Sequence, residues 1–145
     1  MTSKITEAQK QAQARENFFS FLLKRPCTFK QAEEYLSRYE ISDKAKELLL
    51  TEAENMDLIN DLVYAKLFVD GHLSWGNAKI IYELSNKGIS REKINEALEE
   101  TEEESSRAYE VSKGWVNLGL DQRKIINRLL SRGFSLKAAR SVFED

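Results

Sequence analysis

Apolar residues recur at intervals of three and four along several stretches of this chain, which is the pattern of helices that bury one face. In residues 79–98 the apolar stripe contains Ile80, Ile81 and Leu84, and it resumes with Ile94 after an interruption. This spacing predicts two amphipathic helices that are joined by a short turn.

The interruption carries the signals that end one helix and begin the next. Gly88 can adopt a positive φ without the steric cost, about 1 kcal/mol or more, that a residue with a Cβ meets there. Ser90 follows, and its hydroxyl is expected to cap the second helix. The first helix has two candidate caps, Ser74 and Asn77.

The same arrangement returns 45 positions later, in residues 124–143. There Gly133 ends the first helix and Ser135 caps the second, and Asp121 is the expected cap of the first. A further apolar-periodic segment precedes each of the two stretches, so the repeating unit comprises three helices. Six positions are identical at this spacing: Lys79 and Lys124, Ile80 and Ile125, Ile81 and Ile126, Leu84 and Leu129, Gly88 and Gly133, and Ser90 and Ser135.

A fainter copy lies upstream and differs at its turn. Leu36, Ile41 and Ser42 align with the middle copy at an offset of 48. Glu40 stands where the later copies have glycine, so the backbone there either avoids a positive φ or accepts strain.

Local signals also delimit the first helices of this copy. The first is expected in residues 6–24, and Pro26 ends it by disfavouring α geometry at Arg25. Thr28 with Gln31 predicts a capping box at the start of the next helix.

A period near 45 residues built from helical units is the signature of a stacked array in which each unit shields the apolar face of its neighbour. We therefore predict an all-α fold of three tandem, helix-turn-helix-like three-helix repeats, in residues 1–55, 56–102 and 103–145. Such an array presents a long surface to a long partner. The acidic stretch "EETEEESS", residues 99–106, joins the last two units, and we expect it to extend the preceding helix, with a flexible hinge as the alternative.

The composition favours helices and shows an uneven distribution of charge. The chain is 41% apolar and 32% charged, with six Gly and one Pro, and its formal net charge is -2. Residues 1–26 carry five cations against two acids, residues 27–104 nine against 18, and residues 105–145 eight against four. Both ends are therefore basic and the middle is acidic, and such fields act locally.

Several functional classes find no support in the sequence. Phosphate-loop, dinucleotide-binding, zinc-protease and nucleophile-elbow motifs are all missing, so we predict a protein that is not an enzyme and needs no cofactor. Cys27 and His72 are the sole cysteine and histidine and cannot form a Cys/His zinc site. No leader opens the chain and "FFSFLL" is too short to cross a bilayer, so we expect a cytoplasmic protein without membrane contact.

A row of cations near the C-terminus is the best candidate for a binding surface. Lys124, Arg128 and Arg132 recur every four positions and so follow one stripe of a helix. Lys137 and Arg140 are one turn apart on the next helix. A basic stripe suits a phosphate backbone or an acidic protein groove, and a solvated helix face explains it equally well.

The two-helix turn also has the form of a helix-turn-helix, whose second helix reads base edges in the major groove. That helix begins "SREKINEAL" or "SLKAARSVF" here, and neither opens with the Arg, Asn and Gln cluster that base readout prefers. A helix-turn-helix nucleic-acid-binding protein is the alternative to a protein-binding array.

Three segments together carry a resemblance to a known family. They are "LINDLVYAKLFV" at residues 58–69, "WGNAKIIYELSNKGIS" at 75–90 and "KIINRLLSRGFS" at 124–135. In order and spacing the chain resembles the RecX regulatory proteins of bacterial homologous recombination. The matching positions are Asp61, Tyr64, Ala65, Val69, Gly76, Leu84, Gly88, Ile89, Leu129, Arg132, Gly133 and Phe134, whereas Asn60 and Glu40 depart from the family pattern.

The resemblance implies an elongated, curved rod that lies along the groove of the RecA filament on single-stranded DNA. It further implies inhibition of ATP hydrolysis and strand exchange, filament loss and a role in the SOS response. We expect a monomer that contacts RecA through the basic stripe and binds DNA only weakly, because the pI of 5.6 is low. The candidate contact residues are Lys124, Arg128, Arg132, Lys137, Arg140, Lys79 and Lys87.

Overall fold

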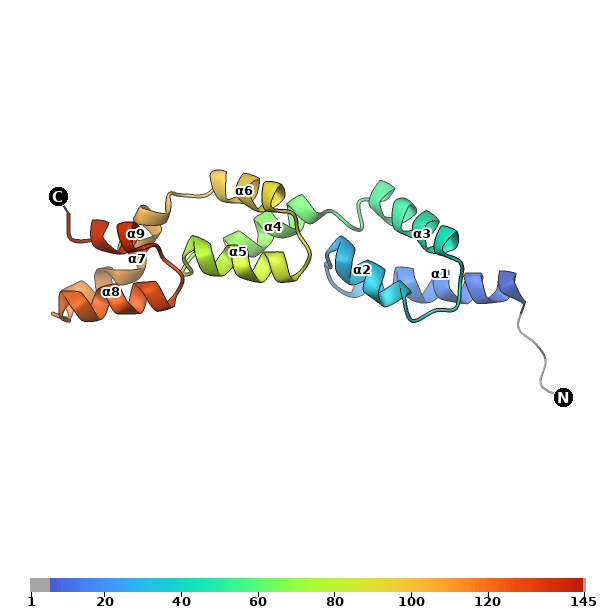
Figure 1. Cartoon of the computed structure of the whole chain (residues 1–145), viewed down its shortest axis with the longest axis horizontal. Coiled ribbons are helices and arrows are strands. Elements are labelled where there is room, and N and C mark those ends of the chain that lie inside the picture. The colour runs from blue at the N-terminus through green and yellow to red at the C-terminus, as the bar shows by residue number, and fades with distance from the viewer. Residues whose placement is uncertain (1–5, 145) are drawn as a thin grey trace. The chain divides into compact units, whose positions relative to one another are not determined.

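The computed structural model describes residues 6–144, and within this range the chain forms nine α-helices and no β-strand (Figure 1). The all-α prediction is confirmed. The helices follow one another in three sets of three. Their bounds are α1 Glu7–Lys24, α2 Phe29–Leu36, α3 Asp43–Asn55, α4 Asp61–Asp70, α5 Asn77–Asn86, α6 Arg91–Glu99, α7 Glu104–Asn117, α8 Gln122–Ser131 and α9 Leu136–Ser141.

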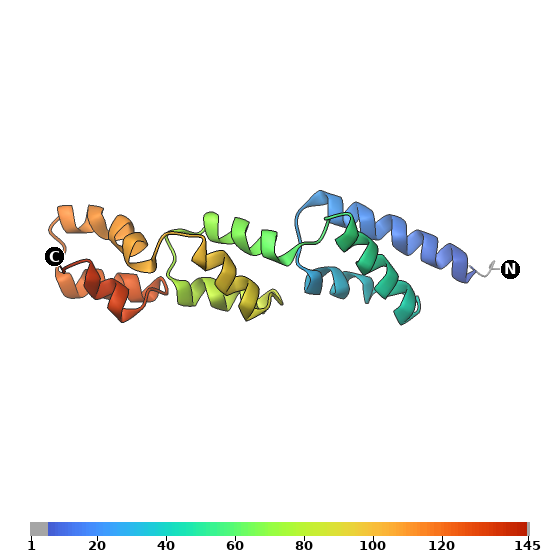
Figure 2. The ribbon, with the colours of Figure 1, turned by 90° about the horizontal axis from the view of Figure 1, so that it is seen from above.

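The first compact unit, unit 1, comprises the chain up to Tyr64 together with residues 87–89. In it α1 packs against α2 and α3 (Figure 2). Phe18 is fully buried, and the ring of Phe21 stacks on Tyr35 with their centroids 4.2 Å apart. The buried core of this unit contains Ala14, Phe18, Leu22, Cys27, Ala32, Leu36, Ile41, Leu49, Leu50, Ala53 and Ile59.

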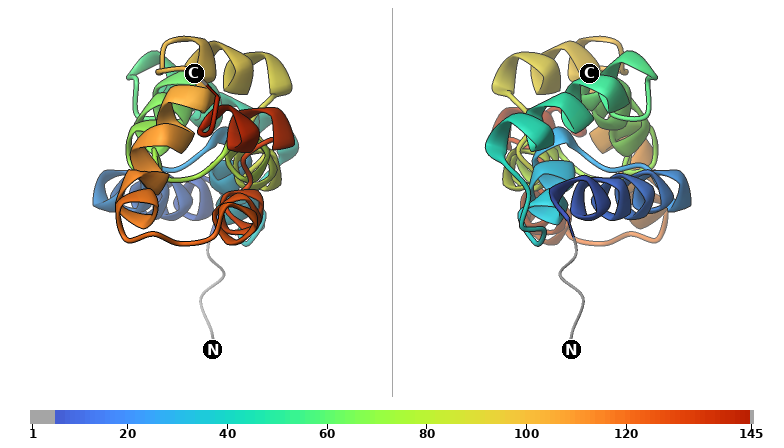
Figure 3. Two further views of the ribbon diagram at one scale, coloured as in Figure 1. Left: turned by 90° about the vertical axis from the view of Figure 1, so that its left-hand side faces the viewer. Right: turned by 90° about the vertical axis from the view of Figure 1, so that its right-hand side faces the viewer.

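The second compact unit, unit 2, comprises residues 65–86 and the chain from Ser90 onward. In it α5 packs against α6, and α7, α8 and α9 pack against one another (Figure 3, left). The core of α7–α9 contains Ala108, Ile125, Leu129, Phe134, Ala138 and Ala139. Buried apolar residues on α4, α5 and α6 are Ala65, Val69, Ile80, Leu84, Ile94 and Ala97.

The predicted caps at Ser90, Ser135 and Thr28 are confirmed, and Ser42 is a further serine cap. Ser42, Ser90 and Ser135 are the N-caps of α3, α6 and α9, and each hydroxyl accepts a hydrogen bond from the N–H three residues later. Thr28 and Gln31 form the predicted capping box at the start of α2.

Two further boundaries lie where the sequence predicts them. Helix α1 ends at Lys24, and Arg25 is extended with φ -165° and ψ 154°, which confirms the effect of Pro26. Asp121 is the N-cap residue of α8, although its side chain makes no capping hydrogen bond.

Glycine ends the middle helix of the second and third sets. Gly88 has a φ of +89° and Gly133 a φ of +93°, as predicted. In the first set Glu40 lies outside the positive-φ region, so the chain avoids strain there. It does so with a longer turn: residues 37–42 connect α2 to α3, whereas residues 87–90 connect α5 to α6.

Two expectations near the last join are wrong. Helix α6 ends at Glu99 and residues 100–103 are not helical, so the acidic stretch does not extend α6. Clustered carboxylates oppose the negative end of a helix dipole, which accounts for the stop. Neither Ser74 nor Asn77 caps α5, because Asn77 is already helical and its N–H donates to Glu104 Oε2 at 2.7 Å.

Gly76 meets a neighbouring backbone that leaves no room for a side chain. A Cβ at this position would lie 2.0 Å from Phe134 N and 2.1 Å from the carbonyl carbon of Gly133. The Gly76 N–H donates to the Arg132 carbonyl at 2.9 Å, and the Ala78 N–H donates to the Gly133 carbonyl at 3.2 Å. The start of α5 and the turn between α8 and α9 therefore dock backbone to backbone.

We expect Gly76→Ala to destabilise unit 2 by more than about 3 kcal/mol, because the obstructing atoms belong to the backbone. Gly114→Ala is the matched control: no atom lies within 4 Å of its Cβ position inside α7. Alanine there should stabilise the helix by about 0.5–1 kcal/mol. Urea unfolding followed by circular dichroism measures both changes, and equal stability of the two variants would contradict the docking.

Candidate functional site

The three cations of the predicted stripe lie on α8 and at its end. Lys124 and Arg128 are exposed, whereas Arg132 is the C-cap residue of α8 and is half-buried. Their spacing of four residues places them on one side of the helix. Arg132 also lies at the negative end of the helix dipole, which favours a cation.

Trp115 on α7 makes cation–π contacts with two of these cations. The guanidinium carbons of Arg128 and Arg132 lie 5.3 Å and 5.2 Å from the centroid of the indole ring. The same ring packs against the core of α7–α9. A guanidinium that stacks on a ring keeps its N–H edge available for a carboxylate or a phosphate. Trp115 therefore fixes both cations while it leaves their donors open to a partner.

Trp75, the second indole of unit 2, precedes α5 and also carries a cation. The Lys79 Nζ lies 4.1 Å from the centroid of its ring. His72 lies beside Trp75 with ring centroids 4.3 Å apart, and stacks on Phe68 at 4.0 Å. Its Nδ1 is 2.6 Å from the Phe68 carbonyl oxygen. His72 thus has a structural position within an aromatic cluster.

The docking of α5 against the turn between α8 and α9 places Lys79 close to the basic stripe. A Cβ on Gly133 would lie 2.5 Å from the Lys79 Cβ, and Arg132 immediately precedes Gly133. Lys79 and Arg132 therefore flank the same turn. We call the following six residues the indole–cation surface: Trp75, Lys79, Trp115, Lys124, Arg128 and Arg132.

Glu104, at the start of α7, binds both elements of this joint. Its Oε2 accepts the Asn77 N–H, at the start of α5, at 2.7 Å. Its Oε1 accepts the Ser135 hydroxyl at 2.7 Å and the Ser135 N–H at 3.3 Å. One carboxylate therefore caps α5 and holds the N-cap residue of α9.

Arg107 also connects α7 to the start of α5, and only 3% of its surface is exposed. Its guanidinium donates to the carbonyls of Leu73 and Trp75 and to Asn77 Oδ1. Burial lowers the pKa of Arg107, and the carboxylates of Glu104 and Glu102 oppose that change. The sequence analysis missed both Glu104 and Arg107, since the partners of each lie about 30 residues away along the chain.

Unit 1 contains a joint of similar design. The Thr28 hydroxyl donates to the Lys87 carbonyl at 2.7 Å. A Cβ on Gly88 would lie 2.4 Å from the Lys30 Cβ. In both units a turn glycine therefore packs against the first turn of a helix.

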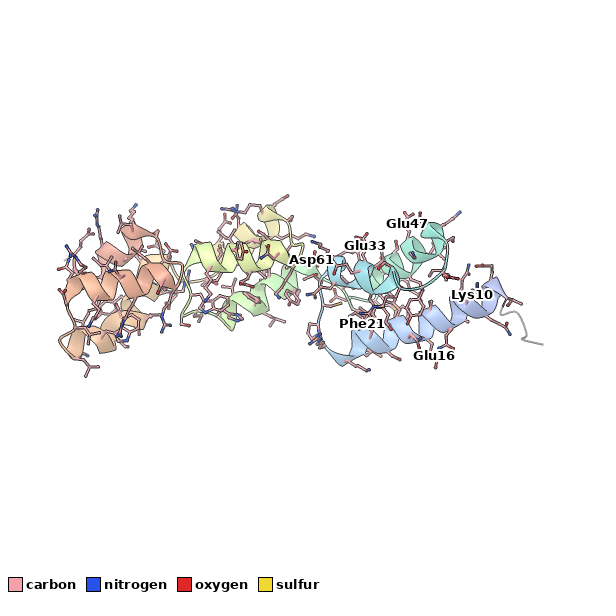
Figure 4. The ribbon with its side chains drawn as sticks, turned by 60° about the horizontal axis from the view of Figure 1, so that its bottom comes forward. Lys10, Glu16, Phe21, Glu33, Glu47 and Asp61 are labelled. Atoms are coloured by element: carbon pink, nitrogen blue, oxygen red, sulfur yellow. The ribbon has the colours of Figure 1, made fainter. Side chains whose placement is uncertain are left out.

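Asp61 acts as a cap in this joint. Asp61 is the first residue of α4, and its side chain lies beside the start of α2 (Figure 4). Its Oδ1 accepts a hydrogen bond from the Phe29 N–H at 2.8 Å. Asp61 thus caps α2 as Glu104 caps α5.

The remaining predicted cations lie in other places. Lys137 and Arg140 are exposed on α9. Lys87 belongs to unit 1 and is half-buried. Their contribution to a partner surface stays a prediction.

Residues 6–144 contain no group of three or more His, Cys, Asp or Glu side chains that could hold a metal ion. None of the helices described above combines the length and apolar character that crossing a membrane requires.

Comparison with known proteins decides the family. Residues 60–98, which contain α4, α5 and all of α6 except Glu99, match the family model of the RecX second three-helix domain. Over 92% of its length the chain is 32% identical to the regulatory protein RecX of Streptomyces coelicolor, and the match covers 79% of that protein. The chain belongs to the RecX family.

Other RecX proteins agree with this assignment. The chain is 30% identical, over 99% of its length, to regulatory protein RecX of Lactobacillus delbrueckii subsp. bulgaricus, and it spans 57% of that protein. The crystal structure of RecX from Lactobacillus salivarius has the same fold, with a TM-score of 0.84 over 94% of this chain and 96% of that chain, at 24% identity. These relatives are named regulatory proteins.

Most positions that carry the resemblance to RecX lie in joints or cores. At Gly76, Gly88 and Gly133 neighbouring atoms exclude a Cβ, and Leu84 is fully buried. These residues of the RecX-family chain therefore determine its fold.

We expect Trp115→Phe to weaken the cation–π interaction with Arg128, because a phenyl ring keeps much of the packing but attracts a cation less strongly. A double-mutant cycle with Arg128→Gln, measured by urea unfolding, should give a coupling of about 0.5–1 kcal/mol. Lys124→Gln, one turn away on α8, is the control, and its effect should add to that of Trp115→Phe. Additive effects for Arg128 as well would show that the stacking contributes nothing.

Proposed function

We propose that this chain is a non-enzymatic regulator of homologous recombination and the SOS response that binds along the groove of the RecA filament on single-stranded DNA. The observation that carries the proposal is the 32% identity to a regulatory protein RecX across 79% of that protein. Bound in this groove, the chain inhibits RecA ATP hydrolysis and strand exchange and promotes disassembly of the filament.

The indole–cation surface supports a contact with an acidic protein groove. Residues 122–143 carry six cations and no acid. Arg128 and Arg132 are held on the ring of Trp115, so less side-chain entropy is lost when a partner binds them. Complementary charge also raises the rate of association and selects among partners.

Inhibition in this way needs no catalytic group on the regulator. A filament exchanges between states that differ in their capacity to hydrolyse ATP. A protein that binds one state more tightly shifts the population toward that state, and it can do so only by the difference between its two affinities. A chain that contacts several RecA subunits through successive helix sets accumulates such a difference.

Contact with RecA, more than contact with DNA, supplies the affinity in this proposal. Residues 27–104 carry 18 acids against nine cations, and this segment repels phosphate groups. The third helix set also argues against the helix-turn-helix alternative. There α9 comprises only six residues and opens with Leu136 and Lys137, which offers little for reading base edges.

The test is the rate of ATP hydrolysis by RecA on single-stranded DNA, with the chain added in substoichiometric amounts. The native chain should lower the rate and co-sediment with the filament. The triple variant Lys124→Glu, Arg128→Glu and Arg132→Glu should need about tenfold more protein for half-inhibition, because it reverses the charge that faces the partner.

The control is the triple variant Lys24→Glu, Lys44→Glu and Lys93→Glu, which makes the same charge change at exposed positions on α1, α3 and α6. It should inhibit as the native chain does, with unchanged circular dichroism in both variants. An unaltered hydrolysis rate without co-sedimentation would reject the proposal. Tight, sequence-dependent binding to DNA with a steep salt dependence would favour the helix-turn-helix alternative.

A further inference from the structure

Glu104 accepts hydrogen bonds from two helix sets at once. One carboxylate oxygen binds the backbone at the start of α5, in the second set, and the other binds Ser135 at the start of α9, in the third. Because hydrogen bonds weaken steeply with distance and angle, a shift of α5 against α9 breaks one side of this bridge.

Arg107 responds to the same displacement. A buried cation is stable only when its donors are satisfied. Its Nη1 and Nη2 donate to the carbonyls of Leu73 and Trp75 and to Asn77 Oδ1, at the segment that leads into α5, whereas its Nε donates to the Glu102 carbonyl before α7. Separation of the two sets would leave both Nη atoms of this buried charge without these acceptors.

We propose that Glu104 and Arg107 are positioning residues that couple the second helix set to the third. Through them unit 2 folds as one cooperative body, and Lys79 is held beside Arg132 on a single surface. The effect on RecA rests on the function proposed above, whereas the coupling itself does not.

The joint in unit 1 shows what this coupling adds. There Asp61 accepts one backbone N–H, from Phe29, and the Thr28 hydroxyl reaches the Lys87 carbonyl. Arg107 is the only charged residue that is buried among residues 6–144, so the joint in unit 1 has no counterpart of it. The bridge by Glu104 and the buried guanidinium are therefore particular to unit 2.

The two tryptophans of the chain allow a direct test, because Trp75 belongs to the second set and Trp115 to the third. Trp75→Phe leaves Trp115 as the sole reporter, and Trp115→Phe leaves Trp75. Urea unfolding is followed by tryptophan fluorescence in each single-tryptophan protein. With Glu104 and Arg107 present, the two midpoints should differ only by the effects of Trp75→Phe and Trp115→Phe themselves on stability.

The change to be measured is the separation of these two midpoints. Glu104→Ala should separate them by about 0.5 M urea or more, since each set then unfolds on its own. Glu104→Gln should separate them less, because an amide keeps one acceptor oxygen and loses the other. Arg107→Ala should act in the same direction; if that variant fails to fold, the Glu104 variants decide.

Glu103→Ala is the matched control, since Glu103 is exposed, adjoins Glu104 and makes no capping hydrogen bond through its side chain. Each midpoint is compared with that of the same single-tryptophan protein with Glu104 intact, and Glu103→Ala should leave both unchanged. If Glu104→Ala lowers both midpoints equally, Glu104 is an ordinary cap and the proposal is overturned.

The consequence for RecA is measured separately. Glu104→Ala should raise the concentration for half-inhibition of ATP hydrolysis about tenfold. The effects of Lys79→Glu and Arg132→Glu on inhibition should be coupled in the native chain and should become additive in Glu104→Ala. If the native chain does not inhibit RecA, the proposed function fails while the unfolding experiment still decides the coupling.

Discussion

The docking of Gly76 against the backbone of the turn between α8 and α9 is the contact on which the rest of unit 2 depends. Helices as short as α5 and α9, with ten and six residues, are not stable alone in water. The start of one helix leaves N–H groups open and the end of another leaves carbonyls open. Pairing Gly76 and Ala78 with the carbonyls of Arg132 and Gly133 satisfies both at once, and only glycine permits that approach.

The same docking determines how the cations are presented. Lys79 lies against Gly133, and Arg132 precedes that glycine, so residues from two helix sets border one turn. Trp115 then aligns Arg128 with Arg132. Glu104 and Arg107, both on α7, stabilise this docking with further hydrogen bonds. In the function proposed above the chain acts only through the differential binding of this surface, so the proposal requires rigidity at the docking of α5 against the turn between α8 and α9.

Local signals in the sequence predicted much of this fold, but they did not predict the docking of α5 against the turn between α8 and α9. Caps such as Ser90 and turn glycines such as Gly133 depend on neighbours within four residues, so the sequence displays them directly. The basic stripe is equally local. Glu104 looked like one carboxylate in a repelling run, because its partners Asn77 and Ser135 are 27 and 31 residues away. Trp115 was visible only as part of an apolar stripe, and its cations come from another helix.

Hydrogen exchange at the amides of Gly76 and Ala78 is the most direct measurement of the docking. These N–H groups would be open to water at the start of an isolated helix and would exchange fast. We predict that both exchange only when unit 2 unfolds, with the same free energy as the amide of the buried Leu129 in α8. Exchange at the rate of an unprotected peptide, while Leu129 stays protected, would contradict the docking and with it the single surface of Lys79 and Arg132.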